Sequence, residues 1–150
     1  MDSTTLAYVA GFLDGDGSIF FQIVKRDDYK LKYQIRSSVA FYQKSDAAEI
    51  LDWLKQLFGC GYIRHNKSGV SDYTIVESKE VKKILQLLQP YVRLKKKQIS
   101  LGLEILEKKD NIKTKQELLE ICKLIDQFAE LNYSKKRTLT YETVSKSLPL

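Results

Sequence analysis

The chain has 150 residues, of which 43% are hydrophobic and 29% charged, with a formal net charge of +6 and an isoelectric point of about 9.2. This length suits one domain with its own core, and the positive charge favours a polyanionic partner without requiring one. Two separated cysteines and one histidine argue against a disulfide scaffold or a histidine-rich metal centre, and no apolar run spans a membrane, so we expect a soluble protein of a reducing compartment with no membrane partner.

A short apolar helix is expected to open the chain, with Ser3 or Thr4 as its N-cap. It ends at residues 14–17, Asp-Gly-Asp-Gly, so two carboxylates lie where a helix dipole disfavours negative charge. Carboxylate and backbone carbonyl oxygens are ligands that Mg²⁺ prefers, and a metal ion would compensate this charge. A turn rich in Asp and Gly is the alternative interpretation.

Small residues recur along one stripe of the same helix, at Ala7, Ala10, Gly11 and Asp14. Such a stripe lets two helix backbones approach closely. The partner helix could belong to the same domain or to a second chain.

Alternating apolar and polar residues predict two strands, 18–26 and 31–42, joined by a loop at 27–30. A helix from Ser45 to about Phe58 follows. Two further strands, 61–67 and 70–76, are expected around a Ser68-Gly69 turn. Three helices follow: 78–88, one led into by 94–98 and reaching about Lys109, and one from the capping box at 114–117 to about Leu131. A basic tail begins at Asn132. This order predicts one α+β domain over residues 1–150, with a four-stranded antiparallel sheet and helices on one face.

The outward faces of the two predicted hairpins carry the side-chain types that read DNA bases. Arginine pairs with guanine, glutamine and asparagine pair with adenine, and a two-stranded ribbon fits the major groove. The outward face of the first hairpin contains no acid along its strands, which favours DNA contact over a plain solvated face. The candidate DNA-binding residues on the hairpins are Gln22, Val24, Arg26, Tyr29, Lys30, Lys32, Gln34, Arg36, Ser38, Ala40, Tyr62, Arg64, Asn66, Lys67, Asp72 and Thr74. In the basic tail, we expect phosphate contacts from Asn132, Ser134 and Lys135.

Residues 6–17, Leu-Ala-Tyr-Val-Ala-Gly-Phe-Leu-Asp-Gly-Asp-Gly, resemble the motif of the LAGLIDADG homing endonucleases. The resemblance extends over nearly the whole chain to the small single-motif members encoded in organellar group I introns; it is carried by 61–64, 70–73, 89–91, 94–98 and 131–135. It implies an αββαββα fold with a DNA-binding saddle and C-terminal helices. It also implies a homodimer whose motif helices meet through Ala7, Tyr8, Ala10, Gly11 and Asp14.

The same resemblance implies the roles of the site residues. Asp16 and the carbonyl of Gly15 would bind Mg²⁺, for which Mn²⁺ or Ca²⁺ could substitute in binding. Gln43 would order water, and Lys95 would stabilise phosphate charge or polarise water. The family pocket often has a further basic residue after Gln43; residues 45–48 supply none here, and Lys44 is the nearest candidate. One Asp16 per chain is half of a two-metal site, which a dimer completes.

The function implied is a Mg²⁺-dependent, site-specific endonuclease in the chloroplast or mitochondrion of an intron-bearing host. It would cut both strands of a long pseudo-palindromic DNA site across the minor groove and leave short 3′ overhangs. The alternatives on this fold are an RNA maturase and a DNA-binding regulator without nuclease activity. Asp16 in its Asp-Gly-Asp-Gly context favours catalysis, because a pure binding protein has no use for it.

Overall fold

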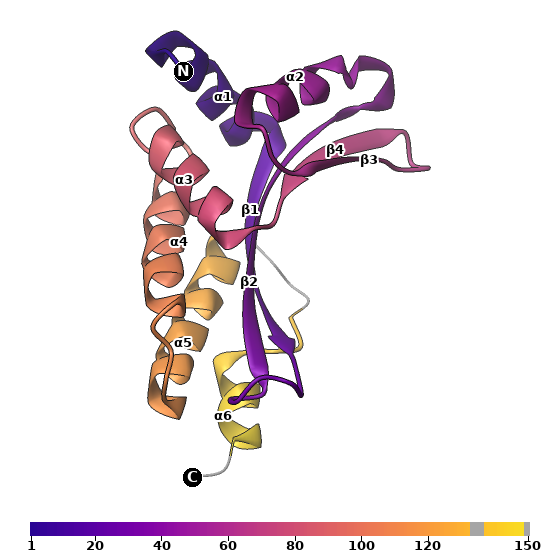
Figure 1. The fold of residues 1–150 in the computed structure, drawn as a ribbon. Helices are drawn as coiled ribbons and strands as arrows, with labels where there is room; N and C mark the ends of the chain where they lie inside the picture. Colours follow the sequence, from indigo (N-terminus) through magenta and orange to yellow (C-terminus); the bar gives the residue numbers. More distant parts are fainter. Residues whose placement is uncertain (133–136, 149–150) are drawn as a thin grey trace. The chain divides into compact units, whose positions relative to one another are not determined.

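A computed structural model describes residues 1–132 and 137–148 of the chain (Figure 1). Its helices and strands alternate in the expected αββαββα order before further helices. In chain order the elements are α1 (Ser3–Asp16), β1 (Gly17–Lys25), β2 (Tyr33–Lys44), the 3₁₀ turn η1 (Ser45–Ala47), α2 (Glu49–Phe58), β3 (Tyr62–His65), β4 (Val70–Ile75), α3 (Ser78–Leu88), α4 (Lys96–Lys109), α5 (Lys115–Leu131) and α6 (Tyr141–Ser147).

The four strands form one sheet in the order β1-β2-β4-β3. Strand β4 pairs antiparallel with β2, where Tyr42 lies opposite Asp72, and with β3, where Arg64 lies opposite the same Asp72. The predicted α+β fold with a four-stranded antiparallel sheet is therefore confirmed. Within residues 1–132 and 137–148, none of the helices has both the length and the hydrophobicity of a membrane-spanning segment.

The chain forms two compact units, and β1 and β2 contribute residues to both. The first unit contains residues 1–20 and 37–96, and the second contains residues 21–36, 97–132 and 137–148. In the first unit, α1 contacts α3, and α2 contacts β3 and β4. Its aromatic core joins Phe41 to Phe12 and to Tyr73, with ring centroids 5.6 and 6.1 Å apart.

The second unit packs the outer part of the first hairpin with the C-terminal helices. The rings of Phe21 and Phe128 meet edge to face at 5.0 Å, and α5 contacts α6. Helix α6 lies in a segment that the sequence analysis described only as a polar, basic tail. A capping box between Thr140 and Thr143 begins this helix, and Val144 is its one buried side chain. So few apolar positions give only a weak helical pattern.

Burial alternates along the strands as the sequence predicted. Ile19, Phe21 and Ile23 are buried on β1, and every second residue from Tyr33 to Phe41 is buried on β2. The predicted N-cap of α1 was wrong: the side chain of Asp2, rather than Ser3 or Thr4, accepts a hydrogen bond from the backbone N–H of Thr5 at 2.8 Å. The capping box at Thr114 and the end of α5 at Leu131 are confirmed.

Two of the glycines that have a positive φ differ in their surroundings, because a side chain would meet a steric clash at only one of them. Gly61 (φ +83) and Gly69 (φ +87) both occupy the left-handed region, but a Cβ at Gly61 would lie 2.7 Å from the carbonyl oxygen of Thr74, whereas one at Gly69 would meet nothing within 4 Å. We predict that Gly69→Ala destabilises the fold by about 1 kcal/mol and that Gly61→Ala destabilises it by clearly more. Urea unfolding of both variants tests this, and equal losses would contradict the close approach at β4.

Candidate functional site

The two carboxylates at the end of α1 have different surroundings. Asp14 is half-buried, and its carboxylate accepts hydrogen bonds from three consecutive backbone N–H groups: Arg93 at 2.7 Å, Leu94 at 3.2 Å and Lys95 at 3.1 Å. Asp16, the last residue of the helix, is exposed. Asp14 is therefore occupied within its own chain, and Asp16 is available to a ligand.

The structure brings Lys95 to the same helix end. Its side-chain ammonium donates a hydrogen bond to the backbone carbonyl of Asp14 at 3.1 Å. The last carbonyls of a helix lack partners within the helix and carry partial negative charge, which favours a cation there. The sequence analysis placed Lys95 and the Asp-Gly-Asp-Gly segment in one site, and the structure brings them next to each other.

The oxygen donors at Asp16 and Gly15 fit a hard divalent cation, because carboxylate and carbonyl oxygens are its preferred ligands. No ion pair within residues 1–132 and 137–148 engages the Asp16 carboxylate. The described residues contain no group of three or more His, Cys, Asp or Glu side chains that could hold a metal ion.

Gln43 lies near the end of β2, opposite Ser71 of β4. Its side-chain oxygen accepts a hydrogen bond from the backbone N–H of Lys44 at 3.0 Å. Among the described residues, no hydrogen bond joins it to Asp16 or Lys95. The structure thus places Gln43 near the end of β2, and its expected role in ordering water stays a prediction.

The residues predicted for a dimer contact differ in exposure. Ala7, Tyr8 and Gly11 are exposed on α1, and a Cβ at Gly11 would meet nothing within 4 Å. Ala10 is fully buried, so its expected place on the partner-facing stripe needs correction: its side chain packs into the core of its own chain. The side chain of Asp14 is likewise held within the chain.

An exposed aromatic pair adds a surface residue that the sequence analysis missed. Tyr8 of α1 meets Trp53 of α2 edge to face, with ring centroids 5.8 Å apart. The two side chains are 54% and 38% exposed, and with Ile50, Thr4 and Thr5 they line a shallow pocket. The helical spacing of Ile50 and Trp53 on α2 could have indicated this apolar patch.

A buried carboxylate organises the second hairpin. Asp72 is 1% exposed and accepts hydrogen bonds from Thr74 at 2.6 Å, from Arg64 at 3.2 Å and from Asn66 at 3.2 Å. Burial acts to raise the pKa of Asp72, but these hydrogen bonds outweigh it, so the pKa is lowered. Asp72 therefore fixes the two neighbouring side chains that could read bases.

This burial corrects the expectation that Asp72 and Thr74 contact DNA directly. Thr74 is 6% exposed and its hydroxyl is directed to Asp72, so neither side chain is presented to a ligand in this structure. Arg64 and Tyr62 are exposed, and the guanidinium lies 5.7 Å from the centre of the tyrosine ring. The predicted DNA-binding residues that remain exposed on this hairpin are Tyr62, Arg64, Asn66 and Lys67.

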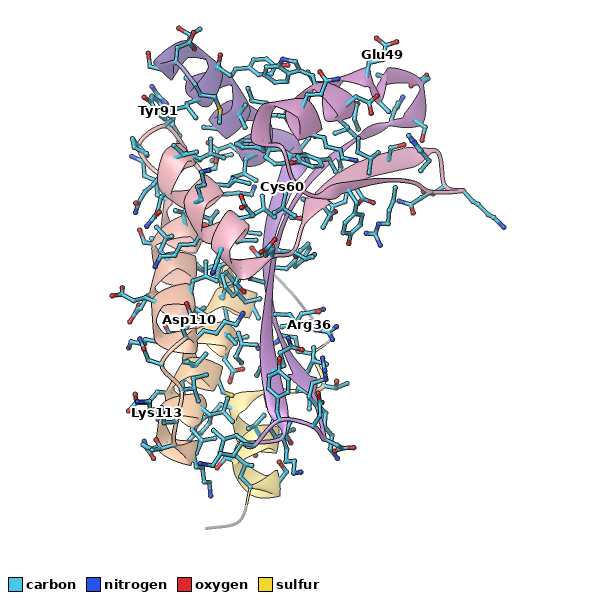
Figure 2. All side chains as sticks on the ribbon, viewed as in Figure 1. Arg36, Glu49, Cys60, Tyr91, Asp110 and Lys113 are labelled. Atoms are coloured by element: carbon cyan, nitrogen blue, oxygen red, sulfur yellow. The ribbon has the colours of Figure 1, made fainter. Side chains whose placement is uncertain are left out.

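A second network fixes the tip of the first hairpin. Arg26 donates two hydrogen bonds to Asp28, at 2.9 and 2.8 Å, and one to Gln34 at 3.0 Å, and it lies over the ring of Tyr29. Arg36, which extends from β2 in Figure 2, also donates to Gln34, at 3.2 Å. The strands carry no acid, as expected, but Asp28 in the loop pairs with Arg26.

The remaining candidates on the first hairpin range from exposed to buried. Gln22, Lys30 and Lys32 are exposed, Val24 and Ser38 are half-buried, and Ala40 is 3% exposed. The structure thus contradicts the prediction that Ala40 contacts DNA, because its side chain is enclosed in the sheet. Asn132 forms the C-cap of α5, whereas Ser134 and Lys135 lie outside the described residues.

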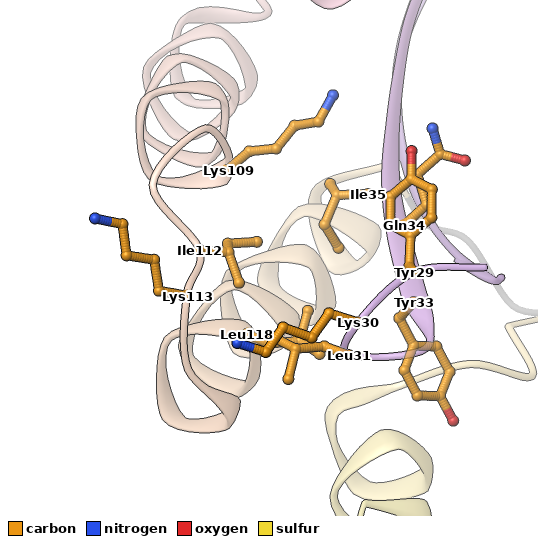
Figure 3. Close-up of a pocket in the computed structure, with 10 residues that line it drawn as sticks. All are labelled: Tyr29, Lys30, Leu31, Tyr33, Gln34, Ile35, Lys109, Ile112, Lys113 and Leu118. Carbon is orange, nitrogen blue, oxygen red and sulfur yellow. The ribbon is translucent and has the colours of Figure 1, made fainter. Parts of the chain in front are cut away.

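A pocket of about 450 Å³ in the second unit has a different chemical character (Figure 3). Apolar residues and three lysines form most of its wall, and burial lowers the pKa of Lys109. Its lining residues are Tyr29, Lys30, Leu31, Tyr33, Gln34, Ile35, Lys109, Ile112, Lys113 and Leu118. Because this set contains no carboxylate, histidine or cysteine, the pocket lacks the usual ligands of a metal centre.

Comparisons with known proteins show which proteins the chain is similar to. Residues 9–106 match the family model described as LAGLIDADG endonuclease. The chain is 38% identical over 147 residues to the DNA endonuclease I-CvuI of Chlorella vulgaris, covering 98% of this chain and 91% of the relative. It is 43% identical over 140 residues to the DNA endonuclease I-CreI of Chlamydomonas reinhardtii, covering 93% and 85%.

Solved structures show the same fold. A crystal structure of I-CvuI with the I-CreI target in the presence of magnesium, in which the DNA is not cleaved, has a TM-score of 0.89 at 38% identity, covering 95% of this chain and 91% of that one. A second structure of I-CvuI, with its own target in the presence of calcium, gives the same values.

The Asp72 network predicts a pH-dependent loss of stability. Because the folded pKa lies below the unfolded value, the carboxylate stabilises the fold above its ordinary pKa of 3.8, and this contribution is lost as the pH falls through the folded pKa. We expect Asp72→Asn to destabilise the protein by about 1 to 3 kcal/mol at pH 7, with the difference from the wild type shrinking below pH 4. Urea unfolding across pH measures this, with Asp110→Asn at an exposed position as control. A constant difference at all pH values would contradict the network.

Proposed function

The chain belongs to the LAGLIDADG endonuclease family, and we propose that it is a site-specific endonuclease that cuts both strands of a long pseudo-palindromic DNA target. One observation carries the proposal: the exposed Asp16 carboxylate lies two residues from Asp14, whose carbonyl holds the Lys95 ammonium. A cation ligand and a fixed positive group at one helix end suit phosphodiester hydrolysis, in which negative charge grows on the phosphate.

The proposed cofactor is Mg²⁺, bound by the Asp16 carboxylate and the Gly15 carbonyl. The I-CvuI structures with magnesium and with calcium support a divalent ion, and Mn²⁺ or Ca²⁺ could replace Mg²⁺ in binding. When bound, such an ion lowers the pKa of water and stabilises the attacking and leaving oxygens. Asp16 positions that chemistry, Lys95 offsets the charge developing on the phosphate, and Gln43 orients water once its side chain leaves the Lys44 amide. Lys44, exposed at the end of β2, is the proposed additional basic residue.

The proposed active form is a homodimer, because one chain supplies only one exposed acid at this helix end. A surface for a second α1 is offered by the exposed residues Ala7, Tyr8 and Gly11. Trp53 extends this surface, because its ring packs against that of Tyr8. A two-fold axis between the α1 helices would bring both Asp16 carboxylates together and match the symmetry of a pseudo-palindromic site.

DNA contact is assigned to the two hairpins and the basic tail. Asp72 holds the side chains of Arg64 and Asn66 by hydrogen bonds. Asp28 and Gln34 hold Arg26 in the same way. These three side chains are therefore ordered before they contact a base. Bound I-CvuI targets support double-stranded DNA as the partner. We further propose that both compact units act as one endonuclease domain, that cleavage leaves short 3′ overhangs, and that the protein works in the organelle that holds its intron.

Asp16→Asn should abolish cleavage while leaving DNA binding in Ca²⁺ within a few-fold of wild type. Losing a metal-binding carboxylate should lower the rate by about a hundredfold or more. The assay uses supercoiled plasmid carrying the I-CreI target, and plasmid libraries of randomised half-sites, with Mg²⁺. Asp110→Asn, which removes one exposed carboxylate from the turn after α4, serves as the matched control.

Two results of this assay would contradict the proposal in different ways. Normal cleavage by Asp16→Asn would refute the metal assignment. Tight, specific binding by the wild type without any nicking in the library would identify a DNA-binding regulator rather than a nuclease.

Gly11→Leu should separate the two chains and abolish cleavage. Leucine favours helix more than glycine does, and the added side chain meets nothing within its own chain, so the fold should persist. Sedimentation velocity measures assembly and circular dichroism measures the fold, with Lys83→Leu on the exposed face of α3 as control. An unchanged dimer with full activity would refute the proposed interface.

A further inference from the structure

The segment before α4 has few side-chain anchors of its own. Arg93 is exposed and Leu94 is 75% exposed, whereas Val92, just before them, is 1% exposed. The backbone N–H groups of residues 93–95 instead converge on one carboxylate, that of Asp14, which lies 79 to 81 positions earlier in the chain. Hydrogen bonds between an ionised acceptor and backbone N–H groups are stronger than neutral ones. Asp14 therefore fixes the path of the chain at Lys95.

Asp14 holds Lys95 at two points. One carboxylate oxygen accepts from the Lys95 backbone N–H at 3.1 Å, and the Asp14 carbonyl oxygen accepts from the Lys95 ammonium at 3.1 Å. The first contact fixes the backbone of Lys95, and the second fixes the position of its ammonium group. A lysine side chain has several rotatable bonds, so two such restraints remove most of its freedom.

We propose that Asp14 is a positioning residue: its carboxylate places the Lys95 ammonium at the end of α1, beside the segment that presents Asp16. This inference rests on the proposed nuclease function only for its catalytic consequence. It assigns different work to the two acids of one motif, since Asp16 binds the metal ion and Asp14 orients the basic group. Because these hydrogen bonds occupy its carboxylate, Asp14 is not proposed as a metal ligand.

Cleavage kinetics test the catalytic consequence through a double-mutant cycle. Asp14→Asn keeps the size of the side chain but removes its charge and one acceptor oxygen. With target DNA and Mg²⁺, we expect the single-turnover rate to fall about tenfold or more, while DNA affinity in Ca²⁺ stays within a few-fold of wild type. In a Lys95→Ala background, Asp14→Asn should cause little further loss. Equal losses in both backgrounds would show that Asp14 does not act through Lys95.

Chemical labelling tests the position of Lys95 without any cleavage. Lysines of the free protein are acylated by a succinimidyl ester, and mass spectrometry measures the rate at each site. Lys95 should react several-fold more slowly than exposed Lys96 and Lys97. Asp14→Ala should bring its rate close to theirs, whereas Asp110→Asn should leave the rates unchanged.

The two readouts separate this inference from the proposed function. An unchanged Lys95 labelling rate in folded Asp14→Ala protein, checked by circular dichroism, would overturn the positioning role even if the wild type cleaves DNA. A wild type that cleaves no DNA would overturn the proposed function, and the labelling result would still decide whether Asp14 holds Lys95.

Discussion

The structure depends on how two negative charges are accommodated at the negative end of one helix. The last carbonyls of α1 already carry partial negative charge, and two carboxylates in this turn add to it. The charge of the Asp14 carboxylate is stabilised within the chain by hydrogen bonds from three backbone N–H groups, those of residues 93–95. Asp16 remains exposed, and no ion pair among residues 1–132 and 137–148 engages it. The divalent cation proposed above would offset its charge.

The same carboxylate links parts of the chain that are distant in sequence. By holding residues 93–95, Asp14 ties α1 to the start of α4 and brings Lys95 to the helix end. Lys95 and Asp16, the proposed basic group and the proposed metal-binding acid, thus lie in one small region of the first unit. In the proposed homodimer, a second copy of that region would supply the other exposed acid.

Buried or paired acids play a comparable part on the hairpins. Asp72 would repel phosphate if it were exposed, but it is enclosed, and it orients Arg64 and Asn66 instead. Asp28 does the same for Arg26 at the tip of the first hairpin. Holding these side chains in place before binding would reduce the entropy lost in the proposed contacts with DNA.

The sequence predicted what depends on short-range patterns. Strand faces followed the two-residue period, since a shift of one residue would expose every buried side chain. The capping box at Thr114 and the stop at Gly59 were equally local. Asp2, Ser3 and Thr4 are all good N-cap residues, so the sequence alone does not show at which of them the first turn begins. The structure selects Asp2. The role of Asp14 and the enclosure of Asp72 depend on distant or cross-strand partners, which no local spacing reveals.

The most direct test of this account is anomalous diffraction from a crystal of the protein with I-CreI target DNA and Mn²⁺. We predict anomalous peaks beside the Asp16 carboxylate of each protomer near a shared two-fold axis, with both Asp14 carboxylates still bound to the backbone of residues 93–95. Peaks distant from Asp16, or an Asp14 carboxylate turned to the metal ion, would contradict the division of labour between the two acids.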